Sequence, residues 1–519
     1  MKRNDIPIML ATAAFSYLFY YQSAGVNYFL FNVLLIILLL VRDSSLLYSR
    51  AFLGAAAGCI VSSFCIFWYD TPLPYTADMI SLILLAGISM DRDSSFIIGF
   101  FHSIYSFLGV SIFFILDMVR GLNSPDTGNA RAKLINKVAL GIIPFLIFLL
   151  FFAIYRSGNP IFDQLASRIN FDFISLPWCF FTLGGFFLMY GFFKQRVISF
   201  LQSADHRTPD SLPPISIDEH IKTILGEMIS LPNFIFTGIL LLILLNILLA
   251  FVNGLDIFYQ CILHDMPPGI TMTQYLHNGT NSLIVSIILA VCIILFYFRG
   301  YLNFYEGNKW LKNLTYIWIA QNIILVISTA YRNSVYIGSY GLTHRRIGVY
   351  VYLILCIVGL VTTFIKVRKG KNNWFLFRKN AWIFYAFMII ACPFDWDSVI
   401  TSFDISKFQS DRTMEIDQRY LADLGYTNLA VLFQYYIVEG KTLHAHADSS
   451  QENIITRGMS SDRQYYEDIK NMIWYKYIYL ETRYAPHSWQ SHCIAKSDNL
   501  HAIEKMMKDN NLICPVYLR

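Results

Sequence analysis

The sequence predicts an all-α membrane protein: a polytopic transmembrane helix bundle of 11–12 helices, followed by a small, mainly helical C-terminal extracytoplasmic domain. Of its 519 residues, 55% are hydrophobic and only 14% are charged, and the mean hydropathy is +0.47. A typical soluble domain has about 25% charged residues. The apolar stretches are continuous, whereas the strands of a membrane β-barrel alternate apolar and polar residues. Because backbone groups in hydrocarbon must be paired, such stretches favour helices.

A helix needs about 20 residues to cross the hydrocarbon core, with a range of about 17–25. The predicted spans are residues 6–21, 25–41, 51–69, 96–116, 138–154, 175–193, 232–252, 283–298, 314–331, 347–367 and 381–394. A twelfth apolar stretch, 79–90, is short and is followed by Asp91, Arg92 and Asp93. The first stretch shows no convincing signal-peptide cleavage site, so we interpret it as a retained helix.

The distribution of Lys and Arg predicts the topology. The basic loops are 42–50, 120–137, 194–228, 299–313 and 368–379, and the positive-inside bias places them in the cytoplasm. The loop 253–282 has neither Lys nor Arg and is expected outside. Three apolar stretches lie between the first two basic loops, and three crossings cannot return the chain to the same side. We therefore expect 79–90 to be re-entrant or interfacial, which gives eleven crossings from a cytoplasmic N-terminus.

A change of composition at residue 395 predicts two domains, a transmembrane bundle (1–394) and a soluble C-terminal domain (395–519). The second carries 13 Lys/Arg against 17 Asp/Glu, a charge of −4, which leaves +9 for the first. The predicted location is the bacterial inner membrane, with the C-terminal domain extracytoplasmic. The expected partner is membrane lipid, and envelope or membrane proteins also suit this architecture. The basic loops lack interleaved stacking aromatics, so no nucleic-acid binding is expected.

The short stretch 331–346 is aromatic and cationic, and the alternation of loops places it outside, where the positive-inside bias disfavours arginine. Its arginines could bind phosphate headgroups or another anionic ligand. They could equally belong to an interfacial belt that anchors the next helix. Tyr340-Gly341 suggests a turn, because glycine can adopt positive φ. The candidate anion-binding residues are Arg332, Tyr336, Tyr340, Gly341, Thr343 and Arg346.

The pattern Tyr336-x-x-x-Tyr340-Gly341-Leu342-Thr343-x-x-Arg346 resembles the central motif of uncharacterised bacterial polytopic membrane families that are catalogued as domains of unknown function. Weaker similarities follow the same order, at 157–162 (with Asn159 in place of an acid), 275–283, Asp417-x-x-Tyr420-Leu421 and Trp489-x-Ser491. The resemblance covers roughly 138–491. It implies the architecture and supplies no reaction.

No other pattern points to a reaction, and the catalytic residues are unknown. His444, His446 and Asp448 could ligate a metal, but a solvated loop is the simpler interpretation, so no metal site or cofactor is predicted. Acids on the expected external side would suit transfer to a lipid carrier, or they merely solvate loops: Asp163, Asp256, Asp265, Asp395 and Asp397. The spans contain little charge, which argues against a proton-coupled pump.

Cys493 and Cys514 are the two cysteines of the predicted C-terminal domain. If this domain faces an oxidising compartment, they are expected to form a disulfide.

Two functions suit these observations. The leading hypothesis is an inner-membrane protein of unassigned activity that acts in envelope homeostasis or as a scaffold. The alternative is a polytopic transferase or transporter that handles a lipid-linked or anionic substrate at the outer face. A lipid-filled cavity beside Arg332 and Arg346 would favour the alternative, and a packed bundle would favour the scaffold.

Overall fold

The computed structural model describes residues 5–122, 148, 151–152, 154–156, 158–166, 176–211, 231–263, 272–299, 306–411, 414, 416–440, 455–484 and 488–515. The chain folds into two compact units. Unit 1 comprises Met1–His206, Tyr385–Phe394 and Leu480–Asp498, and unit 2 comprises Arg207–Phe384, Asp395–Tyr479 and Asn499–Arg519. The chain therefore passes repeatedly between units, and the predicted boundary at 394/395 is one of these passages.

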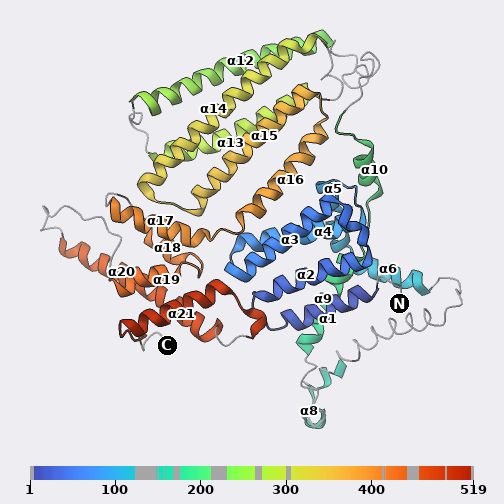
Figure 1. Ribbon diagram of the computed structural model, residues 1–519, viewed down its shortest axis with the longest axis vertical. Helices are drawn as coiled ribbons and strands as arrows, with labels where there is room; N and C mark the ends of the chain where they lie inside the picture. Colours follow the sequence, from blue (N-terminus) through green and yellow to red (C-terminus); the bar gives the residue numbers. More distant parts are fainter. Residues whose placement is uncertain are drawn as a thin grey trace. The chain divides into compact units, whose positions relative to one another are not determined.

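Unit 1 is a bundle formed mainly by the N-terminal helices (Figure 1). Its helices are α1 (Asp5–Phe19), α2 (Val26–Arg42), α3 (Arg50–Tyr69), α4 (Pro72–Met90), α5 (Phe96–Leu108), α6 (Val110–Leu122), α8 (Pro160–Ala166), α9 (Leu176–Phe193) and nearly all of α10 (Ser199–Arg207). Short turns are η1 (Ser44–Tyr48), η6 (Leu480–Tyr484) and η7 (Trp489–Ser491). Helix α3 packs along α4, α2 along α3, and α1 along α9.

Helix α4 differs from the sequence prediction. The short stretch 79–90 is the second part of a 19-residue helix that begins at Pro72 and is long and apolar enough to cross a membrane. Prolines in the first turn are compatible with a helix because the first N–H groups need no intrahelical partner. The break lies instead in the predicted span 96–116, where α5 and α6 meet at an angle of 71° beside Gly109.

Unit 2 contains the longest helices of the described residues (Figure 1). They are α12 (Leu231–Ile257), α13 (Met272–Tyr297), α14 (Lys309–Tyr340), α15 (His344–Lys369), α16 (Asn373–Ala391), α17 (Trp396–Ser410), α18 (Gln418–Asp423), α19 (Leu429–Leu432), α20 (Ile455–Tyr479) and α21 (Ile494–Asp509). Helix α16 ends in unit 1 and α21 begins there. Short turns are η2 (Phe258–Leu263), η4 (Glu306–Asn308) and η5 (Phe433–Val438). Helices α12 to α15 share one apolar core that includes Leu242, Phe298, Val326 and Leu360.

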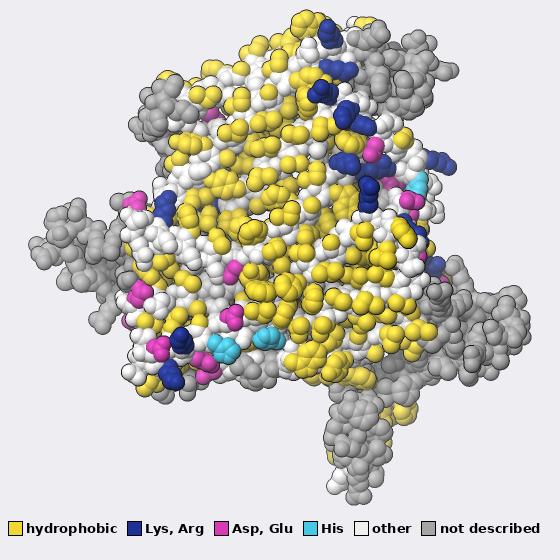
Figure 2. Space-filling view, in the orientation of Figure 1, with side chains coloured by type: hydrophobic (Ala, Val, Ile, Leu, Met, Phe, Trp, Pro, Cys, Tyr) yellow, Lys and Arg dark blue, Asp and Glu magenta, His cyan; other side chains and the backbone are white. Residues whose placement is uncertain are grey.

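Helix α12 buries two asparagines and leaves many of its apolar side chains exposed. Asn246 and Asn253 are buried, whereas Leu244 and Phe251 are 58% and 66% exposed. Figure 2 shows hydrophobic side chains spread over the surface of α12 to α15. Water would disfavour this arrangement, but lipid is as apolar as these side chains. Helices α12 to α15 therefore have the surface expected of membrane-spanning helices.

Helices α12 and α14 run parallel in a fixed register. Three hydrogen bonds join residues that are 68 positions apart: Asn246 Nδ2 to Leu314 O at 3.2 Å, Asn253 Nδ2 to Gln321 O at 3.0 Å, and Gln260 Nε2 to Ser328 Oγ at 2.9 Å. The donors recur every seven residues, which is the repeat of helices that cross at a small angle. In antiparallel helices the number of positions between bonded residues would change along the pair. The constant 68 therefore requires that both helices point the same way.

The described residues form helices and no sheet, with one isolated bridge between Ser211 and Lys371. Among the described residues, five helices are long and apolar enough to span a membrane: α3, α4, α14, α15 and the helix Pro232–Gln260, which joins α12 to the start of η2. Two bent pairs, α5 with α6 and α16 with α17, raise this number to seven, and further apolar helices are shorter. The all-α prediction is confirmed, and several candidate spans are present. Most of the predicted span 138–154 lies outside the described residues.

Candidate functional site

Arg346 closes the turn between α14 and α15. Its Nη1 donates to the carbonyl oxygen of Tyr340 at 2.6 Å and also to that of Gly341. The guanidinium lies 4.4 Å from the ring centroid of Tyr336, and the Tyr336 and Tyr340 rings are 4.7 Å apart. The last carbonyls of a helix lack intrahelical donors and carry partial negative charge, so a cation stabilises them. Arg346 of α15 therefore caps the end of α14.

Gly341 and Thr343 shape the same turn. Gly341 ends α14 with φ 80° and ψ −178°, a conformation almost restricted to glycine. A Cβ there would lie 2.8 Å from Oδ2 of Asp404. The hydroxyl of Thr343 accepts a hydrogen bond from the backbone N–H of Arg346 at 3.4 Å, so Thr343 is the N-cap of α15. The glycine and the threonine thus end one helix and begin the next.

Asp404 attaches the turn to α17. This carboxylate is only 2% exposed, and its Oδ1 accepts a hydrogen bond from the backbone N–H of Leu342 at 2.6 Å. The Asp404 carboxylate can approach the backbone of the turn this closely because Gly341 has no side chain.

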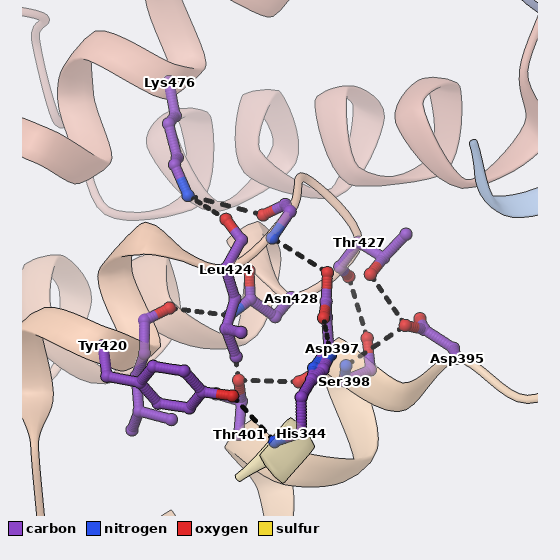
Figure 3. Close-up of polar contacts among 12 residues, drawn as sticks. His344, Asp395, Asp397, Ser398, Thr401, Tyr420, Leu424, Thr427, Asn428 and Lys476 are labelled. Carbon is purple, nitrogen blue, oxygen red and sulfur yellow. Dashed lines mark hydrogen bonds and ion pairs between the residues drawn. The ribbon is translucent and has the colours of Figure 1, made fainter. Parts of the chain in front are cut away.

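A second contact joins the turn to α17 through His344 and Asp397 (Figure 3). Nε2 of His344 lies 2.9 Å from Oδ1 of Asp397, and Oδ2 of Asp397 accepts from the backbone N–H of Gly425 at 2.8 Å. The Asp397 side chain is 8% exposed and that of His344 is 45% exposed. Asp397 therefore links three chain segments, and its imidazole partner faces outward.

Helix α18 contributes Tyr420 to the same cluster (Figure 3). The Tyr420 hydroxyl accepts from the backbone N–H of His344 at 2.9 Å, and burial raises the pKa of this phenol. Asp417 holds Tyr420 in place as the N-cap of α18, because its carboxylate accepts from the Tyr420 N–H at 2.9 Å. Two of the segments that resemble the unknown-function families thus meet in space.

Lys476 lies in α20, which packs against α18, and it donates to the carbonyl oxygens of Leu424 and Gly425. Burial lowers the pKa of its ammonium group. Asp395 is the N-cap of α17 and also accepts from the hydroxyl of Thr427 at 2.7 Å. These side chains hold loops and helix ends in place through hydrogen bonds. Such contacts are typical of a rigid structural cluster rather than of a catalytic site.

Arg332 does not join the other motif residues. It lies in α14 and forms an ion pair with Asp256 of α12 at 2.8 Å, and both side chains are nearly buried. The Ser328 hydroxyl donates to the same Asp256 carboxylate at 2.9 Å. The structure therefore gathers Tyr336, Tyr340, Gly341, Thr343 and Arg346 into one turn and places Arg332 in the α12–α14 interface.

Of the two cysteines predicted to form a disulfide, Cys493 belongs to unit 1 and Cys514 to unit 2. Cys493 and Cys514 are both buried and free. The Sγ of Cys493 instead lies 3.5 Å from the carbonyl oxygen of Trp68. The motif 444–448, Asp265 and the side chain of Asp163 lie outside the described residues. Among the described residues, no group of three or more metal-ligating side chains is present.

Sequence reasoning did not identify Asp404, His344 or Lys476 as members of the cluster. His344 stands inside the motif, but it was not singled out. No spacing in the sequence connects Leu342 with Asp404, which is 62 residues away. The one available signal was the Asp417-x-x-Tyr420 stretch, which has a recognisable N-cap pattern.

The family model described as Domain of unknown function (DUF4153) matches residues 10–435. The chain belongs to this family. The match confirms a domain of unknown function, and it begins far before residue 138, where the resemblance in the sequence was expected to start. No curated protein and no solved structure matches this DUF4153 chain.

Proposed function

We propose that this chain is a scaffold of the bacterial inner membrane that acts in envelope homeostasis, with eleven or twelve spans, a cytoplasmic N-terminus and an extracytoplasmic C-terminal domain. The turn between α14 and α15 acts as a clasp that ties spanning helices to α17 and α18. Its partners are membrane lipid and other envelope proteins. The supporting observation is that the motif cations are used inside the fold: Arg346 caps α14 and Arg332 pairs with Asp256.

The alternative, a transferase or transporter for a lipid-linked or anionic substrate, needs cationic groups that face a ligand. The Nη1 donors of Arg346 are used on two main-chain carbonyls and its guanidinium stacks on Tyr336, so contacts within the protein fix the position of this cation. The cluster around Asp397 likewise uses its polar atoms on main-chain groups of the protein. The geometry therefore favours the scaffold.

The experiment compares abundance with function in a strain that lacks the gene. Envelope integrity is measured as sensitivity to detergent after complementation with the native chain, Arg346→Ala or Arg345→Ala. For a scaffold, Arg346→Ala fails only because less protein accumulates, and raising its expression to the native level restores integrity. For a substrate site, the variant fails even at matched abundance. Failure at matched abundance, with Arg345→Ala active, would reject the scaffold.

A further inference from the structure

Asp78 lies within the candidate span α4, six residues after its first residue and twelve before its last. Its exposed fraction is 3%. The predicted apolar stretch begins at residue 79, so Asp78 lies just outside the spans expected from the sequence. An ionisable group at such a position is costly and is usually retained for a function.

The partners of Asp78 are neutral. Its Oδ1 accepts from Nδ2 of Asn32 in α2 at 2.6 Å and from Oγ of Ser62 in α3 at 2.9 Å. Among the ion pairs of the described residues, none includes Asp78. An ionised carboxylate buried without a cation costs several kcal/mol. Binding a proton removes that charge.

The titratable groups around Asp78 supply no positive charge. Tyr28, Cys59, Tyr385 and Cys392 are the groups within its electrostatic range, and each is neutral when protonated. On the other helices that pack against α4, His102 of α5 has Asp91 and Asp205 as its charged neighbours, and Tyr190 of α9 bonds to Asp117. Arg42 reaches α4 only at Ser89, eleven residues further along, or about 16 Å along the helix axis.

Polar groups lead from Asp78 to the turn between α3 and α4. Tyr75 lies three residues earlier on α4, and its hydroxyl donates to Asp70 at the end of α3. Tyr28 of α2 packs edge-on against Tyr75 with a centroid distance of 5.5 Å and is within electrostatic range of both Asp78 and Asp70. Asp70 in turn pairs with Lys496. Two tyrosines and a carboxylate thus lie on the side of Asp78 that leads to the α3–α4 turn.

We propose that Asp78 is a proton-binding site within the membrane part of unit 1, in exchange with the α3–α4 turn. With the proton bound, the side chain is a neutral carboxylic acid and adds no charge to the helix bundle. On release, the O–H bond breaks, the proton passes toward the Asp70 end, and the carboxylate keeps the Asn32 and Ser62 donors. The ligand is a proton rather than a metal ion, because the neighbouring groups direct N–H and O–H at Oδ1 and not oxygen lone pairs.

The test is infrared spectroscopy of the purified full chain in lipid nanodiscs at about pH 7, where a solvated aspartate is ionised. A protonated carboxylic acid has a C=O stretching band that carboxylates lack. The native chain is expected to show a band that disappears in Asp78→Asn and persists in Asp70→Asn. Asp70 is a matched control because its ion pair with Lys496 favours the carboxylate. Raising the pH should remove the band in the native chain.

Identical acid bands in the native chain and in folded Asp78→Asn would overturn the proposal. Loss of the band on adding Na⁺ at constant pH would also overturn it, since a metal ion would then occupy the site. If Asp78→Asn does not fold, Asp78→Glu replaces it: the band should shift in frequency, and an unshifted band would reject the assignment. Size-exclusion chromatography of each variant establishes that it is folded.

Discussion

The Nη1 atom of Arg346 lies 2.6 Å from the carbonyl oxygen of Tyr340, so the second helix of the α14–α15 pair caps the first. The spacing of the motif follows from this contact. Tyr336 is one turn before Tyr340 and offers its ring to the same guanidinium, Gly341 reverses the chain, and Thr343 begins α15. Each of these motif residues therefore stabilises or shapes the turn between α14 and α15.

Arg346→Ala is expected to lower the free energy of unfolding by about 2–3 kcal/mol, because charged hydrogen bonds to two carbonyls and a cation–π contact are lost. Arg345 is exposed, so Arg345→Ala should change it by less than about 0.5 kcal/mol. Thermal unfolding in detergent and abundance in the membrane measure both effects. Equal losses for the two variants would mean that bulk charge, and not the cap, is what matters.

Gly341→Ala is expected to be more severe. The backbone conformation costs a non-glycine residue about 1–3 kcal/mol, and the new Cβ would approach Oδ2 of Asp404 to 2.8 Å. The contact from Leu342 N–H to Asp404 should break with it. Membrane abundance and thermal unfolding report the loss.

Gly338, in the last turn of α14, is the matched control. A Cβ there meets only Nζ of Lys407, at 3.6 Å. Gly338→Ala should be neutral or stabilising by up to about 1 kcal/mol, since alanine is the better helix former. A loss at position 338 as large as that at 341 would contradict the role assigned to the turn.

The sequence predicted helices and turns, which depend on neighbouring residues, and missed contacts between residues far apart in the chain. Continuous apolar stretches predicted helices, and Tyr340-Gly341 predicted the turn that is found. The hydroxyl of Thr343 accepts from the Arg346 backbone N–H, and the guanidinium turns back to α14. The spacing of Thr343 and Arg346 in the sequence indicates neither contact. Contacts with Asp404 depend on tertiary packing, which leaves no periodic signal.

Helix α4 is longer than the apolar stretch 79–90 because it begins at Pro72. Residues 72–78 contain two prolines and Asp78, and proline and charge usually end an apolar stretch. The prolines lie in the first turn, where they are tolerated, and the carboxyl has buried partners in α2 and α3. Neither compensation can be seen in the sequence.

The thiol of Cys493 is expected to be free and slow to react. Burial raises its pKa to about 11, so at about pH 8 only one thiol in about 1,000 is the reactive thiolate. Alkylation of the folded chain should accelerate about tenfold per pH unit up to that pKa. The stability that this protonated thiol provides is present below the pKa of an unfolded cysteine and is lost as the pH rises through about 11.

Mass mapping distinguishes the free thiol from the disulfide. After denaturation without reductant, both Cys493 and Cys514 should be alkylated, as the structure has both free. A peptide pair joined through these two residues would instead restore the bridge expected for an oxidising compartment.

The register of α12 and α14 bears on the topology of unit 2. Because the two helices run parallel, the segment that follows α12 lies at the same end as the turn after α14. That turn contacts α17 and α18 through Asp404 and Tyr420. The loop 253–282 and the chain from Asp395 onward are therefore expected on one side of the membrane. The positive-inside bias predicts that this side is the exterior, since residues 253–282 have no Lys or Arg while 368–379 is basic.

Reporter fusions after Asn278 and after Asp404 test this sidedness, using an enzyme active only when exported. Both should be active, and a fusion after Lys371, in the basic segment between α15 and α16, should be inactive. The Lys371 fusion is the internal control because it samples the opposite end of α15 from the clasp. Opposite results at 278 and 404 would contradict the parallel packing of α12 and α14. A shared inactive result would keep the packing and reverse the orientation, so that the C-terminal segment and its clasp would face the cytoplasm.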